Sequence, residues 1–479
     1  METKSNIGLI GLGVMGQNLA LNIAHKGFTV SVYNRTREKT NEFVTCKLKG
    51  EQIVGRFDLG SFMVSLETPR KVILMVQAGK AVDSVIAELL PYTEPGDLLI
   101  DAGNSYYPDT ERRLAELEEK GLLFLGMGVS GGEYGALHGP SIMPGGARDA
   151  YDLVADVLTK IAAQTEDGAC CTYLGDGSAG HFVKMTHNGI EYAIMQNTAE
   201  AYDVLRRVYG MPSAGISAVF EEWNKGDLNS YLYEISYKVL RETDKETGNP
   251  LVDVILDSAE QKGTGKWTTQ SAFDLGVPAP TLSASVSSRV VSHFKKYRTR
   301  TAEIAAKAGR TPASTQKADD AALTDLRESC LFAMFISFSQ GLWLLSAASE
   351  AFGYALNIPE VLRIWKGGCI IRAGMLNFLR QIASADAANV NLLMSMKSAE
   401  FLESKLGAVS RVLDTARGQG IPMPVLSSAL DYYLAMSSER LPANFTQAQR
   451  DFFGAHTYER IDKEGSFHTE WEKHLEVGG

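Results

Sequence analysis

Cysteine is scarce in this chain: five residues in 479, an odd number with no Cys-x-x-Cys pair. This excludes a disulfide framework and a zinc site of the usual spacing, and it favours a reducing, cytoplasmic compartment. Cys170 and Cys171 are adjacent in the sequence. We interpret them as two small buried residues on a strand, because a vicinal disulfide would be strained.

Positive charge is also in short supply, since 47 Lys and Arg against 57 Asp and Glu give a formal net charge of −10. This argues against the broad basic surface that nucleic-acid binding requires, so any anionic ligand must be held by a local basic cluster. The chain shows no clear membrane span either. Its most apolar later stretch, 331–348, contains Ser337, Gln340 and Gly341, so we expect a buried helix there. Glu2 fits a signal peptide badly.

What the sequence does contain is an alternation of apolar strand-like runs and helical patterns up to about residue 175. The expected strands are residues 6–10, 29–33, 71–76, 97–101 and 122–129. Such alternation predicts an α/β domain of Rossmann type, with a mainly parallel sheet wrapped by helices. After a glycine-rich break at 175–180 nearly everything reads as helix, and a polar, aromatic-rich segment follows Leu441. We therefore predict a coenzyme domain at 1–178, a large all-helical domain at 179–440 and a C-terminal tail at 441–479.

The helical region contains a weak internal similarity. Trp223-Asn-Lys-Gly226 resembles Trp365-Lys-Gly-Gly368, and the offset of 365 − 223 = 142 also lays the helix at 184–205 over 326–345. The similarity favours an internal duplication into two related helical halves, although chance likeness between two amphipathic helices is the alternative.

A glycine signature follows the first expected strand. Gly11, Gly13 and Gly16 form Gly-x-Gly-x-x-Gly immediately before a helical stretch at 14–25. Gly11 suits a tight turn, Gly13 lets backbone approach a pyrophosphate, and Gly16 allows close helix packing, with the helix N-terminus offering amide donors. The context of strand before and helix after favours nucleotide binding over a glycine-rich turn without function.

The end of the second expected strand indicates which nucleotide. NAD-binding proteins usually place a carboxylate there to take the ribose hydroxyls, whereas this chain has Asn34, Arg35 and Thr36. A guanidinium with neighbouring donors suits the 2′-phosphate of NADP. NADP is therefore expected, the alternative being a solvated turn arginine.

Two further loops fall at the carboxyl ends of expected strands, where open sheets of this kind bind ligands. Residues 101–105 include Asn104, and residues 130–133 begin with Ser130. Their small residues would let a substrate and a nicotinamide come close, although ordinary turn chemistry explains either loop equally well.

The helix after Gly180 carries an unusual polar face. The residues at i, i+3, i+4, i+7 and i+8 are Lys184, His187, Asn188, Glu191 and Tyr192. Their counterparts in the second half of the repeat are Leu326, Ser329, Cys330, Ala333 and Met334, so the architecture does not need the charges. Lys184 can act as a base if burial lowers its pKa, and Glu191 can act as an acid at another carbon; a solvated polar face is the alternative.

Several basic side chains lie outside this helix. Lys262 belongs to a glycine-loosened loop at 261–267, Arg289 lies on a small-residue helix at 283–292, and Arg450 and His456 lie in the tail. Each alone fits an ordinary surface position. Together they form a basic ensemble in an acidic protein, as a phosphate ligand would require.

With these residues in view, the chain resembles the 6-phosphogluconate dehydrogenase family. The resemblance is carried by Gly-Leu-Gly-Val-Met-Gly at 11–16, Asn-Arg-Thr at 34–36, Asp-x-Gly-Asn-Ser at 101–105, Ser-Gly-Gly at 130–132, Lys-Met-x-His-Asn-Gly-Ile-Glu-Tyr at 184–192, Gln-Lys-Gly-Thr-Gly-Lys-Trp at 261–267, and Gln-Ala-Gln-Arg-Asp-x-Phe-Gly-Ala-His-Thr-Tyr at 447–458. The resemblance extends over nearly the whole chain. The catalytic and tail segments are the most specific, because many dehydrogenases share the glycine loop.

The resemblance implies oxidative decarboxylation of 6-phosphogluconate with NADP and no metal, by a homodimer whose tails reach into the partner subunit. It implies Lys184 as the base and Glu191 as the acid. The implied coenzyme residues are Gly11, Leu12, Gly13, Val14, Met15, Gly16, Asn34, Arg35, Thr36, Val76, Gln77, Ala78 and Asn104. The implied substrate residues are Asn104, Ser130, Gly131, Gly132, His187, Asn188, Tyr192, Lys262, Thr264 and Arg289, with Arg450 and His456 from the partner.

One departure and two alternatives accompany this interpretation. Many family members carry a lysine where this chain has Gln77, so coenzyme affinity is expected to differ. A non-decarboxylating 3-hydroxyacid dehydrogenase would share the coenzyme domain and the lysine, but would leave Lys262, Arg289 and Arg450 without purpose. A catalytically silent NADP-binding regulator would leave the Lys184–Glu191 face unexplained.

Overall fold

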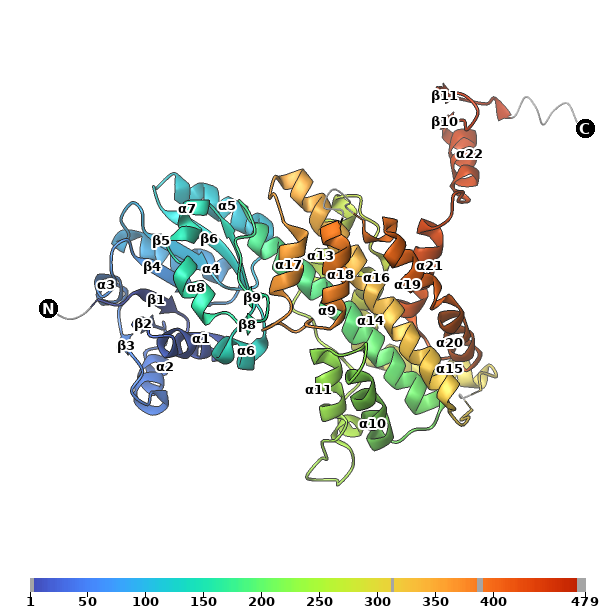
Figure 1. Ribbon diagram of the computed structural model, residues 1–479, viewed down its shortest axis with the longest axis horizontal. Coiled ribbons are helices and arrows are strands. Elements are labelled where there is room, and N and C mark those ends of the chain that lie inside the picture. The colour runs from blue at the N-terminus through green and yellow to red at the C-terminus, as the bar shows by residue number, and fades with distance from the viewer. Residues whose placement is uncertain (1–3, 312–313, 386–390, 472–479) are drawn as a thin grey trace, which may run out of the picture. The chain divides into compact units, whose positions relative to one another are not determined.

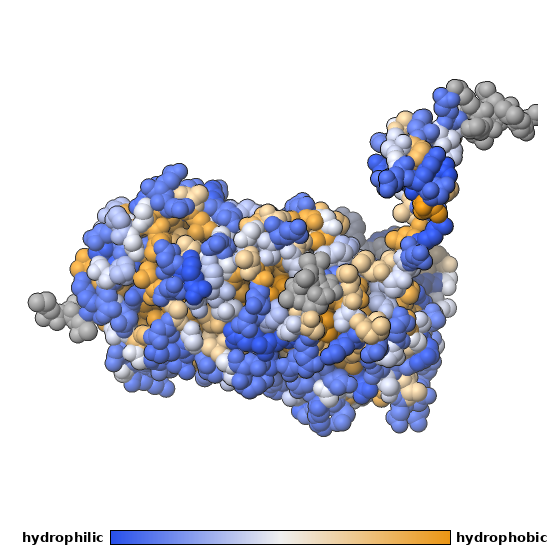
Figure 2. Space-filling model, turned by 45° about the horizontal axis from the view of Figure 1, so that its top comes forward, coloured by the Kyte–Doolittle hydropathy of each residue, from blue (hydrophilic) through white to orange (hydrophobic). Residues whose placement is uncertain are grey.

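The structure is a computed structural model that describes residues 4–311, 314–385 and 391–471. The chain divides into two compact units, one up to Ala429 and one from Leu430, and each is described by itself. The first unit contains an α/β part followed by a helical part (Figure 1). On the face drawn in Figure 2, hydrophilic residues cover most of this unit, with hydrophobic residues in patches between them.

The α/β part is built on a seven-stranded sheet of order β3-β2-β1-β4-β5-β6-β7. The strands are β1 Ile7–Ile10, β2 Val30–Tyr33, β3 Ile53–Arg56, β4 Lys71–Leu74, β5 Leu98–Asp101, β6 Leu123–Val129 and β7 Ile142–Gly146. Neighbouring strands are parallel except β7, which pairs antiparallel with β6. This confirms the predicted Rossmann-type sheet. The five expected strands are present, and the sequence interpretation missed β3 and β7, the two edge strands.

Helices cover both faces of the sheet. They are α1 Val14–His25, α2 Arg37–Glu42, α3 Leu59–Val64, α4 Lys80–Leu89, α5 Tyr107–Glu118, α6 Gly132–His138, α7 Arg148–Asp152 and α8 Ala155–Ile161, followed by a small hairpin of β8 Gln164–Thr165 and β9 Gly168–Ala169. Side chains alternate along each strand. In β5, Leu98 and Ile100 join the core beneath α1 and α8, whereas Leu99 joins the core beneath α3 and α4. The apolar runs therefore reflect burial on both faces.

The helical part of the first unit starts with a long helix. Its elements are α9 Ala179–Asp203, α10 Ser213–Asn224, α11 Tyr231–Val239, α12 Leu251–Val254, α13 Thr264–Asp274, α14 Pro280–His293, α15 Lys295–Lys307, α16 Asp320–Phe352, α17 Ile358–Ile364, α18 Met375–Ala385, α19 Met396–Glu403, α20 Leu406–Gly418 and α21 Pro424–Met436, the last of which continues into the second unit. Short 3-10 or π-helical turns lie at Phe43–Lys47, Leu90–Tyr92, Val204–Val208 and Leu392–Met394.

Glycines let α9 pack directly on the sheet. A Cβ atom added at Gly128 of β6 would lie 2.4 Å from Lys184 Cβ, and one at Gly145 of β7 would lie 2.3 Å from the amide nitrogen of Gly180. A larger residue at either position would push the helix away. This close approach joins the α/β and helical parts into one unit and sets Lys184 against the sheet. The predicted boundaries at 178 and 440 and the predicted internal duplication stay predictions.

Helix α16 is the buried helix that the apolar stretch at 331–348 predicts. Among the described residues it is the one helix long and apolar enough to cross a membrane by length and composition. However, 83% of its most apolar window is buried inside the protein, as in the core helix of a globular unit.

Two local expectations need correction. Cys170 and Cys171 are buried and unpaired, as expected, but they do not lie on a regular strand, because only an isolated bridge joins Cys171 to Ile142. The predicted loop at 261–267 is shorter than expected. Gly263, with φ of +99°, caps α13, so residues from Thr264 onward are helical.

The second unit contains α22 Ala443–Gly454 and a hairpin of β10 Tyr458–Glu459 and β11 Ser466–Phe467. Its centre is polar. The buried carboxylate of Asp451 accepts hydrogen bonds from the Thr457 and Thr469 amides and from Trp471 Nε1, and it pairs with His468 Nδ1 at 2.9 Å. Burial raises the pKa of Asp451, but the bonds from His468, Thr469 and Trp471 outweigh it and lower the pKa to about 2. An ionised Asp451 therefore organises this segment.

Candidate active site

The glycine loop forms a tight connection between β1 and α1. Gly11 has φ of +102°, and an added Cβ would lie 2.3 Å from the Met75 carbonyl oxygen. One at Gly16 would lie 1.9 Å from the Gly11 carbonyl oxygen, so both positions require glycine. Gly13 instead faces open space and caps α1 without a side-chain hydrogen bond. The first amides of α1 are thus available to an anion, and the loop fits a dinucleotide pyrophosphate.

A cavity of about 320 Å³ lies at the ends of β1, β2 and β4. Its lining includes Asn34, Arg35, Thr36 and Lys39. Asn34 Oδ1 accepts the Leu12 amide at 3.0 Å and Asn34 Nδ2 donates to the Thr36 carbonyl at 3.1 Å, so this side chain fixes the two loops relative to each other. Arg35 is exposed at the cavity, and no other described residue forms a hydrogen bond with its guanidinium.

A second cavity, of about 790 Å³, continues from the first, because Gly13, Met75, Val76 and Gln77 line both. We call the two together the coenzyme cleft. Residues lining its larger end include Val14, Met15, Gly16, Ala78, Gly79, Gly103, Asn104, Tyr106, Lys262, Thr264 and Trp267. Tyr106, before α5, stacks on Trp267 of α13 with ring centroids 4.8 Å apart. Both the α/β and the helical part therefore build this end.

Lys184 lies at the centre of the polar face of α9. It is 6% exposed, and its Nζ donates to Asn188 Oδ1 at 2.6 Å and lies 3.5 Å from both Ser130 Oγ and His187 Nδ1. His187 Nε2 lies 3.2 Å from Ser130 Oγ, which connects α9 to the loop after β6. The expected helical stripe and the expected Ser130 loop thus meet in space.

Burial changes the protonation of this face. Burial lowers the pKa of Lys184, against the opposing effect of Glu191, and it lowers the pKa of His187 well below 6.5 with help from Lys184. Burial also raises the pKa of Glu191, with Lys184 and Arg289 opposing it. The shifts favour a neutral amine, a neutral imidazole and a protonated carboxyl group. An amine whose pKa is lowered and a carboxyl group whose pKa is raised therefore share one helix face.

The loop after β6 has little freedom. Gly131 has φ of +107°, and an added Cβ would lie 2.5 Å from the Gly368 carbonyl oxygen. Gly132, with φ of +62°, begins α6 and faces open space. Trp365, fully buried, presents its ring edge-on to His187 at 5.7 Å between centroids. The loop is thereby held so that Ser130 points at the polar face of α9.

A cationic group lies next to Glu191. The Arg289 guanidinium of α14 lies 3.5 Å from the ring centroid of Tyr192, and its Nη1 donates to the Glu260 carbonyl at 3.4 Å. A Cβ added at Gly265 would lie 2.7 Å from the Tyr192 ring, so α13 approaches closely. Thr264 is buried at the start of α13, and Lys262 is exposed just before it. Beside the polar face, Arg289 and Lys262 thus supply cationic donors, and Tyr192 and Thr264 supply hydroxyl donors.

Comparison with known proteins connects this arrangement to one family. The family model for the NAD binding domain of 6-phosphogluconate dehydrogenase matches residues 6–175, and the model for the 6-phosphogluconate dehydrogenase C-terminal domain matches residues 180–471. The chain belongs to the 6-phosphogluconate dehydrogenase family. The resemblance drawn from the sequence is confirmed.

Relatives match over nearly their whole length. The chain is 49% identical to the NADP(+)-dependent decarboxylating 6-phosphogluconate dehydrogenase of Bacillus subtilis, covering 98% of this chain and 100% of the relative. It is 47% identical to an NAD(+)-dependent decarboxylating enzyme of the same organism, with 98% and 99% covered. A Plasmodium falciparum 6-phosphogluconate dehydrogenase, solved as apo form and with NADP+ or 6-phosphogluconate, has a TM-score of 0.93 at 42% identity, with 97% and 100% covered.

Most predicted site residues come together in the first unit. The residues gathered around the coenzyme cleft and the polar face come from the glycine loop, the loops after β2, β4, β5 and β6, and α9, α13 and α14. Arg450 and His456 lie in the second unit, where Arg450 Nη1 donates to Gln447 Oε1 at 3.0 Å and the His456 ring lies 5.8 Å from that of Phe453. Their role in the site of the partner subunit stays a prediction.

The sequence interpretation missed several residues of the site. Lys39 lines the smaller cavity four residues after Arg35, and a second cation so close in the sequence could have pointed to it. Tyr106 and Trp365 had no such signal, because Tyr106 meets Trp267 and Trp365 meets His187 only through packing between distant segments. Within residues 4–311, 314–385 and 391–471 no cluster of three or more His, Cys, Asp or Glu suits a metal ion.

Proposed function

We propose that this protein oxidises and decarboxylates 6-phosphogluconate to ribulose 5-phosphate and CO2 while reducing NADP. The observation that carries the proposal is the pairing on α9 of a buried amine whose pKa is lowered with a carboxyl group whose pKa is raised, beside a cleft that fits a dinucleotide. Such a pair suits a reaction in which the hydroxyl group on one carbon loses a proton and a different carbon gains a proton in a later step.

In the first step Lys184 acts as a base. Its neutral Nζ takes the proton from the C3 hydroxyl while the C3 hydrogen leaves as hydride, leaving a ketone at C3. The coenzyme, when bound, supplies the acceptor for that hydride. Asn188 Oδ1, 2.6 Å from Nζ, orients the amine for this transfer.

In the second step the bond to the carboxylate carbon breaks. CO2 leaves, the electron pair moves toward the C3 ketone, and the protonated Lys184 returns its proton to that oxygen to give an enediol. Because the lysine supplies the positive charge at the developing enolate, we propose that no metal is needed. Glu191, kept protonated by burial, then protonates the carbon that lost CO2, which becomes C1 of the product.

The remaining polar groups hold the substrate. The carboxylate and hydroxyl end of the substrate is surrounded by Ser130, Gly131, Gly132, Asn104, His187 and Asn188. Tyr192, Lys262, Thr264 and Arg289 take the phosphate, because a guanidinium and an ammonium beside hydroxyl donors match a dianion.

NADP is the proposed coenzyme because Arg35 and Lys39 line the smaller cavity of the cleft. The one glutamate in that lining, Glu88, does not lie at the end of β2, where NAD-binding proteins place the carboxylate that binds the ribose. Relatives of both NADP-named and NAD-named kinds occur at similar identity, so the preference depends on such residues. Gln77 lines both cavities and lacks the charge that a lysine would add there. The unpaired cysteines suit a cytoplasmic location.

The direct test is an absorbance assay of reduced coenzyme with 6-phosphogluconate and with 3-hydroxyisobutyrate, each with NADP and with NAD, accompanied by CO2 measurement. We expect turnover with 6-phosphogluconate and NADP, and one CO2 for each reduced coenzyme. Reduction without CO2, or preference for 3-hydroxyisobutyrate, would instead indicate a non-decarboxylating 3-hydroxyacid dehydrogenase. No turnover with any pair would indicate a silent NADP-binding regulator.

We further propose a homodimer in which Arg450 and His456 complete the phosphate site of the partner subunit. Both side chains are exposed in a segment organised around Asp451, and exposed Phe445, Phe452 and Phe453 on α22 offer an apolar contact. A closed two-fold dimer would make the exchange reciprocal. Mixing Arg450→Ala chains with Lys184→Met chains should restore activity, since each heterodimer regains one intact site. Verified heterodimers that stay inactive would contradict the exchange.

A further inference from the structure

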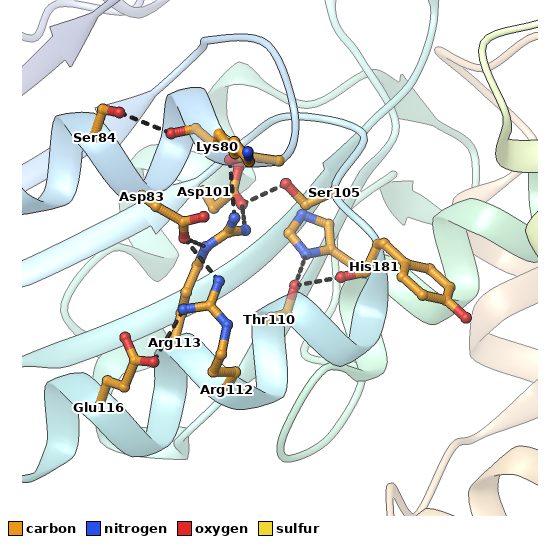
Figure 3. Close-up of polar contacts among 12 residues, drawn as sticks. Lys80, Asp83, Ser84, Asp101, Ser105, Thr110, Arg112, Arg113, Glu116 and His181 are labelled. Carbon is orange, nitrogen blue, oxygen red and sulfur yellow. Dashed lines mark hydrogen bonds and ion pairs between the residues drawn. The ribbon is translucent and has the colours of Figure 1, made fainter.

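Arg113 of α5 lies behind the coenzyme cleft and is 1% exposed. Its guanidinium donates in three directions (Figure 3): Nη2 to the Gly79 carbonyl at 3.1 Å, Nη1 to Asp101 Oδ2 at 3.3 Å, and Nε to Asp83 Oδ1 at 2.7 Å. Gly79 ends the loop after β4, and Asp101 is the last residue of β5, directly before the next loop. One buried side chain thus contacts two loops that line the cleft.

Asp101 passes this contact on to the loop that follows it. Its Oδ1 accepts the Gly103 amide at 3.0 Å and its Oδ2 accepts Ser105 Oγ at 2.6 Å, and Gly103 and Asn104 line the larger cavity. The carboxylate is fully buried, so it needs the guanidinium as a charge partner. Arg113 therefore determines how residues 102–105 are presented to the cleft.

Arg113 also holds the loop after β4, through Gly79. Its φ of +87° and ψ of −139° cap α4 in a conformation that only glycine adopts readily, and its carbonyl accepts both the Val82 amide and Arg113. Val76, Gln77 and Ala78 lead into this turn and line the cleft. The guanidinium fixes the turn from behind.

Helix α5 is itself held against α9. Thr110, one turn before Arg113, lies 2.7 Å from Nδ1 of His181, which is one turn before Lys184. A Cβ at Gly126 would lie 2.7 Å from Thr110 and 2.8 Å from His181, so this glycine makes room for the pair. The frame that carries Arg113 is thus tied to the helix that carries the proposed base.

We propose that Arg113 is a positioning residue for coenzyme binding, acting through the backbone of residues 76–79 and 102–105. The inference rests on the proposed function in one respect, that a nicotinamide coenzyme occupies the coenzyme cleft. A lysine retains the charge but not the planar fork, and a single ammonium cannot contact Gly79, Asp83 and Asp101 in the same geometry.

The neighbouring Arg112 provides a matched control. It contacts the same carboxylate, Asp83 Oδ1, at 2.9 Å and also Glu116 at 3.0 Å, but it is 44% exposed and touches neither loop. Replacing it by lysine changes the same chemical group on the same helix. An effect specific to the two loops should therefore appear at Arg113 and be absent at Arg112.

The experiment compares Arg113→Lys with Arg112→Lys in the full-length protein, by NADPH fluorescence titration, circular dichroism and the KM for 6-phosphogluconate. We expect the Kd for NADPH of folded Arg113→Lys to rise about tenfold, as when one charge-assisted hydrogen bond is lost. The substrate KM should rise less, because only Asn104 connects residues 102–105 to the substrate, and both values of Arg112→Lys should stay within about twofold of wild type. An unchanged Kd in Arg113→Lys, or an equal rise in Arg112→Lys, would overturn the inference.

If Arg113→Lys does not fold, Asp101→Asn keeps the volume and weakens one arm of the same contact. A rise in its NADPH Kd of about threefold or more supports the inference, and an unchanged Kd overturns it. Absence of NADPH binding by the wild-type protein would overturn the proposed coenzyme as well. Wild-type binding with unaltered variants contradicts only the role of Arg113.

Discussion

Helices α9 and α16 pack against each other and are both largely buried, but they bury different chemistry. The buried polar side chains of α16, Ser329, Ser337, Ser339 and Gln340, are neutral. Ser337 donates to its own helix at the Ala333 carbonyl, and Gln340 accepts the Thr281 amide at the start of α14. Helix α9 buries Lys184, His187 and Glu200. Because an ionisable group costs free energy to bury, its presence on only one of two similarly placed helices requires a specific reason.

The reason differs along α9 itself. Glu200 is 2% exposed, and its carboxylate accepts the Val425 and Leu426 amides at 2.9 and 3.1 Å, so it caps α21. Lys184 instead meets the neutral side chains of Asn188, Ser130 and His187 at the cleft. The first group has a role in the fold, whereas the second has polar partners but no bonded counter-charge. We infer that α9 keeps Lys184 for chemistry.

The largest effect should follow from removing the amine. Lys184→Met should lower kcat with 6-phosphogluconate and NADP by roughly 10⁴-fold, the upper range for a lost general base, while NADPH still binds. Since the pKa of Lys184 is lowered from 10.5, the wild-type rate should fall as the pH drops below that lowered value and protonates the amine. Steady-state kinetics against pH measures both. The control is Lys160→Met, at an exposed lysine on α8. Near-normal turnover in Lys184→Met would exclude Lys184 as the base.

Glu191→Gln should lower turnover less, by roughly 10²- to 10³-fold, because a glutamine cannot donate the proton that the enediol requires. Rapid quench should show reduced coenzyme forming before the product is released. Glu200→Gln makes the same replacement further along α9 and should retain wild-type turnover at neutral pH. If both glutamine variants lose activity equally, the distinction drawn between the two ends of the helix is wrong.

Glu200 should affect stability rather than turnover. Burial raises its pKa from 4.5 to about 7, partly opposed by the Val425 and Leu426 amides. The folded state therefore favours the protonated carboxyl group, so this stabilisation is complete below pH 4.5 and is lost as the pH rises through about 7. Relative to Glu200→Gln, the wild-type free energy of unfolding should fall by roughly 3 kcal/mol across that window.

Denaturant unfolding at pH 4.5 and pH 8 measures this difference. Glu400→Gln, at an exposed glutamate of α19, should give a pH dependence parallel to wild type. A parallel dependence in Glu200→Gln would show that the cap does not titrate with folding.

The smallest effect should follow from changing the smaller cavity of the coenzyme cleft. Arg35→Ala should weaken NADP binding roughly tenfold to thirtyfold and leave NAD nearly unchanged, since only NADP presents a 2′-phosphate to the guanidinium. Arg37, which lies over the Phe57 ring at 4.9 Å, is the neighbouring control. Equal losses for the two coenzymes would show that Arg35 does not recognise the phosphate.

Local patterns predicted much of this structure. The glycine spacing and periodicity gave α1 at Val14–His25, and the i, i+3, i+4 spacing gave the polar face of α9. Edge strands β3 and β7 were missed because they contain Gly55, and Pro144 with two glycines, which are residues that strands disfavour.

Long-range contacts could not be predicted in this way. Arg113 lies in an ordinary charged helix pattern, and only the folded chain brings it to Gly79 and Asp101. For Arg450 and His456 the role in the partner subunit stays a prediction, drawn from their place in the basic ensemble and from the family resemblance.

The most direct test of why α9 differs from α16 is the free energy of unfolding of Lys184→Met at pH 7, compared with wild type. Methionine fills a similar volume without a group to desolvate, and Asn188 Oδ1 keeps the His187 Nδ1 contact at 3.1 Å. We expect the inactive variant to be at least as stable as wild type. A loss of more than about 1 kcal/mol would contradict it, because Lys184 would then be holding the fold together.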